Sequence, residues 1–489
     1  MGQAAVAGRS VLVELSCLAG IERSRHVTLE RQVAERLRAA VSNGHLPAGG
    51  RLPPTRALAL DLGIARNTLA LAYEQLVAEG YLEARKGAGT YVAKSARRAP
   101  TPIAATPKTF QPLPAPTPSV VAAPGLGLVS FSACRPAMMP FPVREWRRAF
   151  ARAASRPPGS DYGDPAGDTM LREAIAGYLR PARSLNVASD NVVITAGASQ
   201  AVALLAKLLI RPGDAAAIEN PGYPLARHAL MAAGARIVPI QVDADGLIVD
   251  ALPCGSSAPK VVYVTPSHQY PLGARLALFR RIALLAWAEQ HDAVIIEDDY
   301  DGEFRYDAAP LPPLAALDDT GRVAYVGTFS KTLSPTLRLG FVVASSAITA
   351  ELIKIKVSYD YHAPELTQQA LATLIRDGVF GRHVARMRRV YAERRAVLQE
   401  ELAPLQGVAD LRGLSAGLHT WLAVTDQACV DRVRHSLLSA GVVLTPVSAY
   451  AADATMAPGG FILGYGAFAP HTIRTLCRSL RQVFGDCAS

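Results

Sequence analysis

Lys331 is the residue whose surroundings best suit covalent chemistry. It ends the segment Gly327-Thr328-Phe329-Ser330-Lys331, directly after an apolar stretch and seven residues before Arg338. A lysine amine reacts with an aldehyde only after losing its proton, which burial or a neighbouring positive charge favours. The sequence therefore predicts that Lys331 is the catalytic residue and holds an aldehyde cofactor as a Schiff base.

A phosphate needs several donors at one place, such as the amides at a helix start, hydroxyl groups and an arginine. The segment Gly197-Ala198-Ser199-Gln200 follows a predicted strand and opens a predicted helix over 201–209. Each feature alone would be a weak signal. Together with side chains near Lys331 they predict a phosphate-binding cup formed by Ala198, Ser199, Thr328, Ser330 and Arg338.

The ring of such a cofactor needs a carboxylate beside its pyridine nitrogen, which keeps the nitrogen protonated and the ring an electron sink. Asp298 ends an apolar run and is placed to supply that carboxylate. Tyr300 could donate to the ring hydroxyl, and Tyr223 could stack on the ring face, although ordinary packing is the stronger expectation for any single tyrosine.

Metal binding is the alternative use of the acidic run 297–301. No histidine follows this run at ligand spacing, and the six cysteines show neither CxxC nor any other metal spacing. We therefore expect no metal and reduced thiols, as in a cytoplasmic protein.

The elements that must position these residues are short buried-type strands alternating with helical stretches. The strands are predicted over 192–195, 215–219, 261–265, 293–298, 323–327 and 341–344. This alternation indicates an α/β fold with a mostly parallel sheet and helices on both faces. In such a sheet ligands bind beyond the carboxyl ends of the strands, and each polar cluster above follows a strand.

The first fifth of the chain has a different pattern. Apolar spacing predicts a helix around 29–41, a short helix over 55–62 that ends at Gly63, and a third helix that stops near Gly80. Two strands joined by a tight turn at 86–89 follow, which completes a winged helix-turn-helix. Residues 1–98 contain 14 basic and 8 acidic residues, so they carry +6 of the formal net charge of +10. This concentration of positive charge indicates a polyanionic partner.

A helix-turn-helix reads DNA with the N-terminal part of its second helix in the major groove. Here that part supplies side chains for base edges and phosphates, and the wing tip can enter the minor groove. The predicted DNA-binding residues are Arg51, Arg56, Arg66, Asn67, Thr68, Lys86, Gly87 and Gly89. The alternative is a solvated basic face on a protein–protein module.

A proline-rich segment separates the two parts. Between residues 95 and 127 proline recurs among small residues with few charges, which favours an extended linker. A loop folded onto a domain surface is the alternative. The predicted domains are therefore 26–94, 95–127 and 128–489, and no stretch is long and apolar enough to predict a membrane span.

The segment around the second helix resembles the winged-helix domain of GntR-type repressors. The resemblance covers residues 26–93 and rests on Gly50-Arg51-Leu52-Pro53-Pro54-Thr55-Arg56, Leu62-Gly63-Ile64-Ala65-Arg66-Asn67-Thr68 and Glu79-Gly80-Tyr81-Leu82. Ala65 stands where that family usually has serine. The recognition helix thereby loses an N-cap, at a typical cost of ~1 kcal/mol unless another group substitutes.

The rest of the chain resembles fold-type I aminotransferases and, in detail, the MocR/GabR-type regulators, in which a GntR-type reader is fused to such a domain. The most specific strings are Thr265-Pro266-Ser267-His268-Gln269-Tyr270-Pro271, Ile296-Glu297-Asp298-Asp299-Tyr300-Asp301 and the Lys331 segment. The resemblance implies pyridoxal phosphate (PLP) on Lys331, a smaller C-terminal α+β subdomain and a homodimer. It also implies that Asp298 pairs with the ring nitrogen, that Tyr162 reaches a phosphate across the dimer interface, and that His268 and Gln269 line the site.

One departure bears on activity. Aminotransferases usually bind the substrate α-carboxylate with an arginine shortly before the C-terminal helix, whereas this chain has Ile462 there, leaving Arg412 as a candidate substitute. We therefore expect a cytoplasmic regulator that binds operator DNA and senses an amine, an amino acid or PLP itself. The alternatives are a true PLP-dependent aminotransferase with an appended DNA-binding domain, and a regulator whose sensor has lost the cofactor and binds another metabolite.

Overall fold

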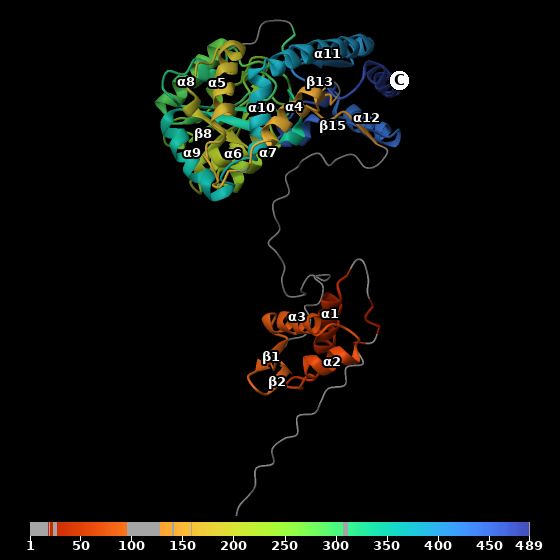
Figure 1. Cartoon of the computed structure of the whole chain (residues 1–489). Helices are drawn as coiled ribbons and strands as arrows, with labels where there is room; N and C mark the ends of the chain where they lie inside the picture. Colours follow the sequence, from red (N-terminus) through yellow and green to blue (C-terminus); the bar gives the residue numbers. More distant parts are fainter. Residues whose placement is uncertain are drawn as a thin grey trace, which may run out of the picture. The chain divides into compact units, whose positions relative to one another are not determined.

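The computed structural model describes residues 18, 20–22, 27–94, 128–138, 141–157, 159–306 and 312–488. The chain divides into two compact units, Met1–Ala115 and Pro116–Ser489 (Figure 1). The predicted linker over 95–127 lies outside the described residues.

The N-terminal unit is a winged helix-turn-helix, as predicted. Helices α1 (Leu29–Ser42), α2 (Thr55–Asp61) and α3 (Arg66–Ala78) precede an antiparallel hairpin of β1 (Leu82–Arg85) and β2 (Gly89–Val92). Thr28 caps α1 by accepting a hydrogen bond from the Arg31 amide. The three helices and the hairpin enclose one apolar core, which contains Val33, Leu37, Leu58, Leu69, Tyr73, Leu76, Leu82 and Val92.

A polar clamp joins the first and third helices of this unit. The guanidinium of Arg38 donates two hydrogen bonds, of 2.8 and 2.7 Å, to the carboxylate of Glu79. Glu79 follows the last turn of α3, and Gln75 donates to the same carboxylate. The clamp therefore fixes the end of α3 against α1.

The C-terminal unit is built on an eight-stranded sheet in the order β4-β11-β10-β9-β8-β5-β6-β7. Pairing shows that β11 and β7 run opposite to the other six strands. The sheet is therefore mostly parallel, as predicted. Its strands are β4 (Val192–Thr195), β5 (Ala215–Asn220), β6 (Arg236–Asp243), β7 (Gly246–Leu247), β8 (Val261–Val264), β9 (Val294–Asp298), β10 (Val323–Thr328) and β11 (Gly340–Val343).

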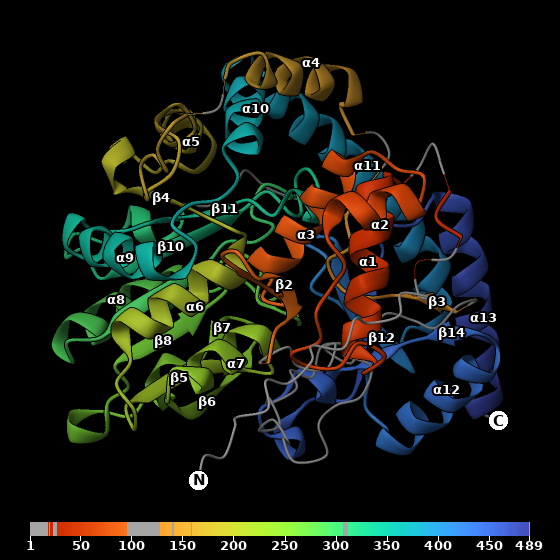
Figure 2. The ribbon, with the colours of Figure 1, turned by 60° about the horizontal axis from the view of Figure 1, so that its bottom comes forward.

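Helices cover both faces of this sheet. Helices α6 (Ala198–Leu209), α7 (Pro224–Ala232) and α9 (Ser346–Tyr359) contribute apolar side chains to the core on one face. On the other face lie α5 (Thr169–Arg183) and α8 (Leu278–Gln290), as Figure 1 shows. Two helices that lie far apart in the sequence, α4 (Val143–Ala154) and α10 (Glu365–Arg376), pack side by side (Figure 2).

A smaller α+β part follows the long helix α11 (Val379–Leu402). Its four-stranded antiparallel sheet has the order β12-β13-β16-β15, with β12 (Ala409–Arg412), β13 (His419–Val424), β15 (Thr445–Pro446) and β16 (Gly460–Gly464). Helices α12 (Gln427–Ser439) and α13 (Pro470–Ala488) pack together beside it. The distant strand β3 (Val129–Ser130) pairs with β14 (Val442–Val443), so the start of this unit is tied to its end.

Among the described residues, no helix combines the length and the apolar composition that crossing a bilayer would need.

Candidate cofactor site and DNA-binding surface

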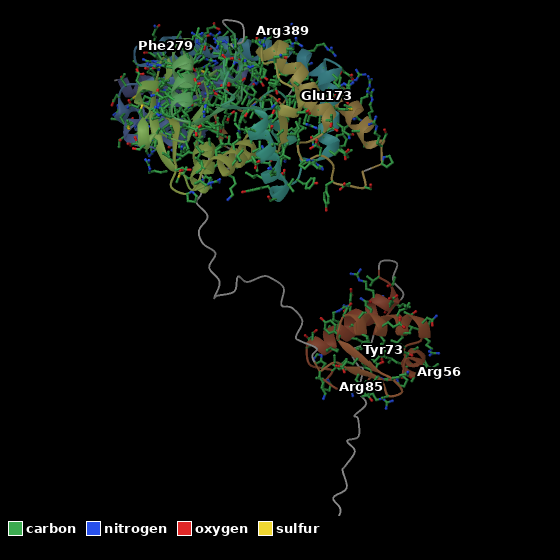
Figure 3. All side chains as sticks on the ribbon, turned by 90° about the vertical axis from the view of Figure 1, so that its left-hand side faces the viewer. Arg56, Tyr73, Arg85, Glu173, Phe279 and Arg389 are labelled. Atoms are coloured by element: carbon green, nitrogen blue, oxygen red, sulfur yellow. The ribbon has the colours of Figure 1, made fainter. Side chains whose placement is uncertain are left out.

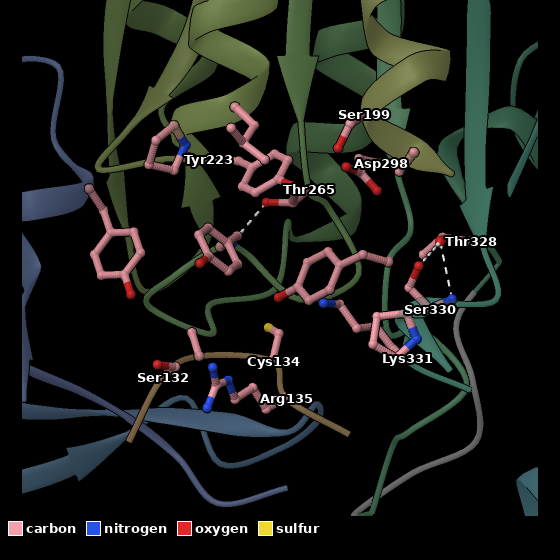
Figure 4. Close-up of a pocket in the computed structure, with 18 of the residues that line it drawn as sticks. Ser132, Cys134, Arg135, Ser199, Tyr223, Thr265, Asp298, Thr328, Ser330 and Lys331 are labelled. Carbon is pink, nitrogen blue, oxygen red and sulfur yellow. Dashed lines mark hydrogen bonds between the residues drawn. The ribbon is translucent and has the colours of Figure 1, made fainter. Parts of the chain in front are cut away.

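A cavity of about 310 Å³ opens at the carboxyl ends of the parallel strands. Asp298 ends β9 and Thr328 ends β10, and both line this cavity. Figure 4 shows Lys331, Thr328 and Ser330 on the same side of it. Nine of the predicted cofactor residues line the cavity together: Ala198, Ser199, Tyr223, Asp298, Tyr300, Thr328, Ser330, Lys331 and Arg338.

The predicted phosphate cup lies at the start of α6. This helix begins at Ala198 without a side-chain cap, so its first amides remain free for an anion. Gly197, with φ +87°, precedes it, and a Cβ there would come within 3.0 Å of the Arg338 guanidinium. Glycine is therefore needed for Arg338 to approach the loop, where it donates a 2.7 Å hydrogen bond to the Ala196 carbonyl.

A buried lysine supports the same loop from α9. The amine of Lys356, which is fully buried, donates to Asp360 Oδ1 at 2.7 Å, and Gln200 Nε2 donates to Asp360 Oδ2 at 2.8 Å. Gln200 Oε1 in turn accepts from the Ala196 amide at 2.7 Å. Lys356, Asp360 and Gln200 therefore connect α9 to the loop that opens α6.

Asp298 has one engaged oxygen and one oxygen without a partner. Its Oδ2 accepts a 2.7 Å hydrogen bond from the Tyr263 hydroxyl, whereas Oδ1 is buried and has no hydrogen-bond partner among the described residues. Burial raises the pKa of Asp298 to about 7, and the nearby carboxylates of Asp299 and Asp301 add to the shift while Tyr263 and Lys331 oppose it. A donor entering the cavity would satisfy the unpartnered oxygen.

The other carboxylates of the acidic run are not part of the cavity lining. Glu297 accepts the amides of Leu314 and Ala315, and Asp301 bonds His268. Asp299 forms a buried ion pair with Arg183. Glu297, Asp299 and Asp301 therefore each bond to other parts of the unit, whereas Asp298 and Tyr300 of the same run line the cavity.

Tyrosines form much of the remaining wall. The rings of Tyr223, Tyr300 and Tyr450 each lie edge-on to Tyr270, with centroids 5.3, 5.7 and 5.5 Å away. Burial raises the pKa of Tyr223 to about 12, so its hydroxyl stays protonated. The Tyr300 hydroxyl donates to the His268 carbonyl at 2.9 Å. We expected this hydroxyl to donate to a hydroxyl of the cofactor, and it could do so only by giving up the bond to His268.

Three predicted site residues lie outside the cavity lining. His268 and Gln269 are buried behind it: His268 Nδ1 lies 2.9 Å from Asp301 Oδ2, and Gln269 donates to the Pro221 carbonyl at 2.9 Å. Tyr162 is 73% exposed, and its ring packs against Tyr361 with the centroids 5.2 Å apart.

Sequence reasoning missed several lining residues. Ser132, Cys134 and Arg135 follow β3, and Figure 4 places them across the cavity from Ser199 and Asp298. No motif marks this segment. Cys134, with φ +57°, turns the chain, and its Sγ lies 3.1 Å from His419 Nδ1. The other missed lining residues include Tyr263, Thr265, Tyr270 and Tyr450.

The donor set of the cavity fits a phosphorylated pyridine aldehyde. The free amides of α6 and the guanidinium of Arg338 suit a phosphate, and the unpartnered oxygen of Asp298 suits a protonated ring nitrogen. Lys331, half-buried in the same cavity, offers the amine for the aldehyde.

The N-terminal unit presents a basic surface on α3 and the hairpin. Arg66 and Asn67 are exposed in the first turn of α3, and Thr68 is half-buried behind them. Arg56 on α2 and Lys86 at the hairpin turn are also exposed. Arg56 and Arg85 lie on the surface of this unit in Figure 3.

The hairpin is braced by two arginines. Arg51 forms a backbone bridge with Tyr91, and its side chain passes Gly89 so closely that a Cβ there would lie 3.2 Å from Nε. The Arg85 guanidinium carbon lies 4.4 Å from the centre of the Tyr91 ring. Gly87 has φ +76°, a left-handed conformation that glycine adopts more readily than other residues. Arg51 therefore packs along the hairpin, while Lys86 lies exposed at its turn.

Comparison with known proteins gives two matches to families. Residues 131–478 match the family described as aminotransferase class I and II, and residues 29–92 match the bacterial regulatory proteins of the gntR family.

Individual relatives are similar over most of the chain. The probable rhizopine catabolism regulatory protein MocR of Rhizobium meliloti is 38% identical over 95% of both chains. The HTH-type pyridoxine biosynthesis transcriptional regulator PdxR of Corynebacterium glutamicum is 33% identical, over 91% of this chain and 94% of its own. Among solved structures, kynurenine aminotransferase of Pyrococcus horikoshii in complex with PMP is similar, with a TM-score of 0.69 and 26% identity over 75% of this chain and 92% of that one.

Proposed function

This chain belongs to the aminotransferase class I and II family, in its MocR-type branch of DNA-binding transcriptional regulators, and we propose that it is a PLP-dependent sensor of that type. The N-terminal unit binds operator DNA, and the C-terminal unit responds to an amine, an amino acid or PLP itself. One observation carries the proposal: Lys331 and Asp298 line the same cavity, and Asp298 Oδ1 has no hydrogen-bond partner among the described residues.

PLP, when bound, supplies an aldehyde that reacts with amines and a ring that accepts electrons. The Lys331 amine would hold the aldehyde. Asp298 would keep a proton at the ring nitrogen while Tyr263 fixes its other oxygen. Tyr223 would cover the ring, and the phosphate would be held by the α6 amides and by Ala198, Ser199, Thr328, Ser330 and Arg338.

The proposal extends to the organisation of the chain. Residues 26–94 would form the DNA-binding domain, 95–127 the linker and 128–489 the sensor. A homodimer would place Tyr162, which is exposed in the single chain, where it can contact the partner's phosphate. A protein that reads chromosomal DNA shares a compartment with it, so we propose the cytoplasm.

An effector can act through Lys331. An amine that competes with the Lys331 amine, and that binds one conformation of the sensor better than another, shifts their populations. In a dimer this shift would change how two winged helices engage two half-sites.

Two measurements on the full-length protein test the proposal. After loading with PLP and reduction with borohydride, peptide mapping should place the phosphopyridoxyl group on Lys331. Lys331→Ala should lose it, whereas Lys354→Ala, on an exposed lysine paired with Glu351, should keep it. Selection from genomic DNA should recover a specific, salt-sensitive site. An unmodified Lys331, or binding to DNA without sequence preference in every ligand state, would contradict the proposal.

A second candidate is aminotransferase activity, which the similarity to kynurenine aminotransferase favours. Ile462 argues against efficient turnover of ordinary amino acids because it is an apolar, fully buried residue of β16. Assays over an amino-acid and keto-acid panel distinguish the two: many turnovers, lost in Lys331→Ala, would favour the enzyme.

A further inference from the structure

The position expected to bind a carboxylate is occupied by apolar packing. Ile462 lies opposite Trp421 in the pairing of β16 with β13, and it packs in a small core with Leu272, Val447 and Tyr450. Its side chain can offer an anion neither charge nor hydrogen bonds. If an effector amine carries an acidic group, another residue must bind that group.

Arg412 does not fill this role in the structure. Its side chain is exposed, and its guanidinium carbon lies 5.2 Å from the centre of the Trp421 ring. Arg412 is also absent from the cavity lining. This arginine therefore packs on an aromatic surface outside the site.

Three basic side chains are among the described residues of the cavity lining, and two of them already have roles. Lys331 is assigned to the aldehyde, and Arg338 is bonded to the Ala196 carbonyl beside the phosphate cup. The third is Arg135, across the cavity from Ser199 (Figure 4). Arg135 is exposed, as Arg412 is, but unlike Arg412 it lines the cavity. Within the described part of the chain, the guanidinium of Arg135 makes no hydrogen bond or ion pair.

The backbone explains why Arg135 reaches the cavity. The Phe131 carbonyl accepts a 2.9 Å hydrogen bond from Gly464, which fixes the segment after β3 to the end of β16. In extended chain, alternate side chains would face opposite sides. The left-handed conformation of Cys134 breaks this alternation, and residues 132–135 all line the cavity.

The charge around Arg135 is not balanced within the cavity. Among the described residues of the lining, Asp298 is the only carboxylate. Figure 4 places it on the opposite wall, and it would pair with the pyridine nitrogen. A guanidinium presents parallel N–H groups that match a carboxylate in a two-point contact. An unpaired arginine in the same cavity lining as the reactive lysine therefore favours an anion attached to an amine.

We propose that Arg135 binds the acidic group of the effector, so that the sensor recognises amines that carry a carboxylate or a similar anion. The proposal rests on the proposed function, because the amine of the same molecule must reach the aldehyde on Lys331. It assigns Arg135 the role that Ile462 cannot perform.

The test compares amines that differ only in the acidic group. Full-length protein loaded with PLP is titrated with glycine, β-alanine and γ-aminobutyrate, and with the matched methylamine, ethylamine and propylamine. Binding is followed by the visible absorption of the cofactor and, independently, by calorimetry. The variants are Arg135→Met, Arg135→Lys and the control Arg412→Met.

We expect wild type to bind at least one of the amino acids more tightly than its matched alkylamine. Arg135→Met should weaken that amino acid by about 10- to 100-fold, the loss typical of hydrogen bonds to a charged group, and change the alkylamine less than about twofold. Arg135→Lys should restore part of the affinity, and Arg412→Met should behave as wild type.

Several results would overturn the inference. One is that Arg135→Met weakens the binding of an amino acid and of its matched alkylamine equally, which indicates a structural role. Another is that Arg135→Met leaves the affinity for the amino acid unchanged. A wild type without preference for acidic amines, or one that responds to none of them, also overturns it. If wild-type protein fails to take up PLP on Lys331 before any amine is added, the proposed function itself fails. This outcome is distinct from a failure of the role proposed for Arg135.

Discussion

At the scale of single residues, Asp298 stands out because its burial conflicts with its charge. Its side chain is 3% exposed, and one oxygen lacks a hydrogen-bond partner within the described residues. In the cofactor-free protein, ionising this carboxyl leaves a negative charge without a donor on the cavity side. The raised pKa of about 7 is the consequence.

This conflict predicts a pH-dependent effect of Asp298→Asn on the cofactor-free protein. A carboxyl with a pKa near 7 in the folded chain and an ordinary pKa of 3.8 in the unfolded chain stabilises the fold fully below pH 3.8, and that stability is lost as pH rises towards 7. Asparagine has no such loss. The unfolding free energy of the variant minus that of wild type should therefore increase between pH 5 and pH 7, by roughly 1 kcal/mol per pH unit. The difference in melting temperature should grow in the same direction.

Thermal unfolding at several pH values measures this difference. Asp319→Asn, at an exposed position before β10, serves as the control and should show a constant difference. A constant difference for Asp298→Asn as well would contradict the prediction.

Sequence reasoning found nine residues of the cavity lining but missed the segment 132–135. Lys331 and Asp298 could be predicted because each stands in a recognisable string after an apolar run. Arg135 could not, because its approach to the cavity depends on the left-handed Cys134 and on pairing between β3 and the distant β14. His268 stands in an equally specific string, yet it bonds Asp301 behind the cavity.

At the scale of elements, the start of α3 lacks a side-chain cap. Ala65 occupies the N-cap position, with φ −65° and ψ 138°, and makes no side-chain hydrogen bond to the first turn. The predicted loss of a cap is therefore confirmed. The amides left free by this loss are on the helix that carries Arg66 and Asn67.

Ala65→Ser should stabilise the N-terminal unit by ~1 kcal/mol, because the backbone at this position already has the extended conformation of an N-cap. Thermal or urea unfolding of the full chain, followed by a signal from the N-terminal unit, measures the gain. Ala88→Ser at the exposed hairpin turn is the matched control and should change stability little. No gain for Ala65→Ser would mean that another group already satisfies these amides.

Six of the eight strands of the large sheet were predicted by range, and the failure to predict β6 has a physical cause. Strand β6 was missed because Pro239 interrupts it, and proline is unfavourable in a central strand. The structure tolerates this proline because β6 pairs with β5 along one side, while its other neighbour, β7, pairs only with Val242 and Asp243. The N–H that proline lacks is therefore not needed for pairing on the outer side.

At the scale of the whole molecule, binding to DNA and sensing belong to different units. The sequence predicted this division from the change in charge and composition around the proline-rich segment. It could not predict the pairing of β3 with β14, which joins residues more than 300 positions apart.

Arg66→Met should remove a contact with the operator. We expect an affinity loss of about 10-fold or more for the specific site, since a good arginine–base contact is worth about 1–3 kcal/mol. Arg31→Met, on an exposed arginine of α1 paired with Glu35, should bind as wild type does. Fluorescence anisotropy at several salt concentrations measures both, and equal losses would argue against recognition through α3.

The cavity between the two sheets has a thermodynamic consequence for the C-terminal unit. Its lining takes Asp298 and Thr328 from the large sheet, and residues 132–135 from a segment hydrogen-bonded to the small one. A ligand that binds only when both are folded adds about 2.7 kcal/mol at 100 times its dissociation constant. Calorimetry should therefore show broader, earlier melting without PLP and sharper, later melting with it. When PLP is scarce, more of the regulator would be unfolded and open to proteases. The supply of PLP would then determine how many copies of the regulator remain to bind DNA.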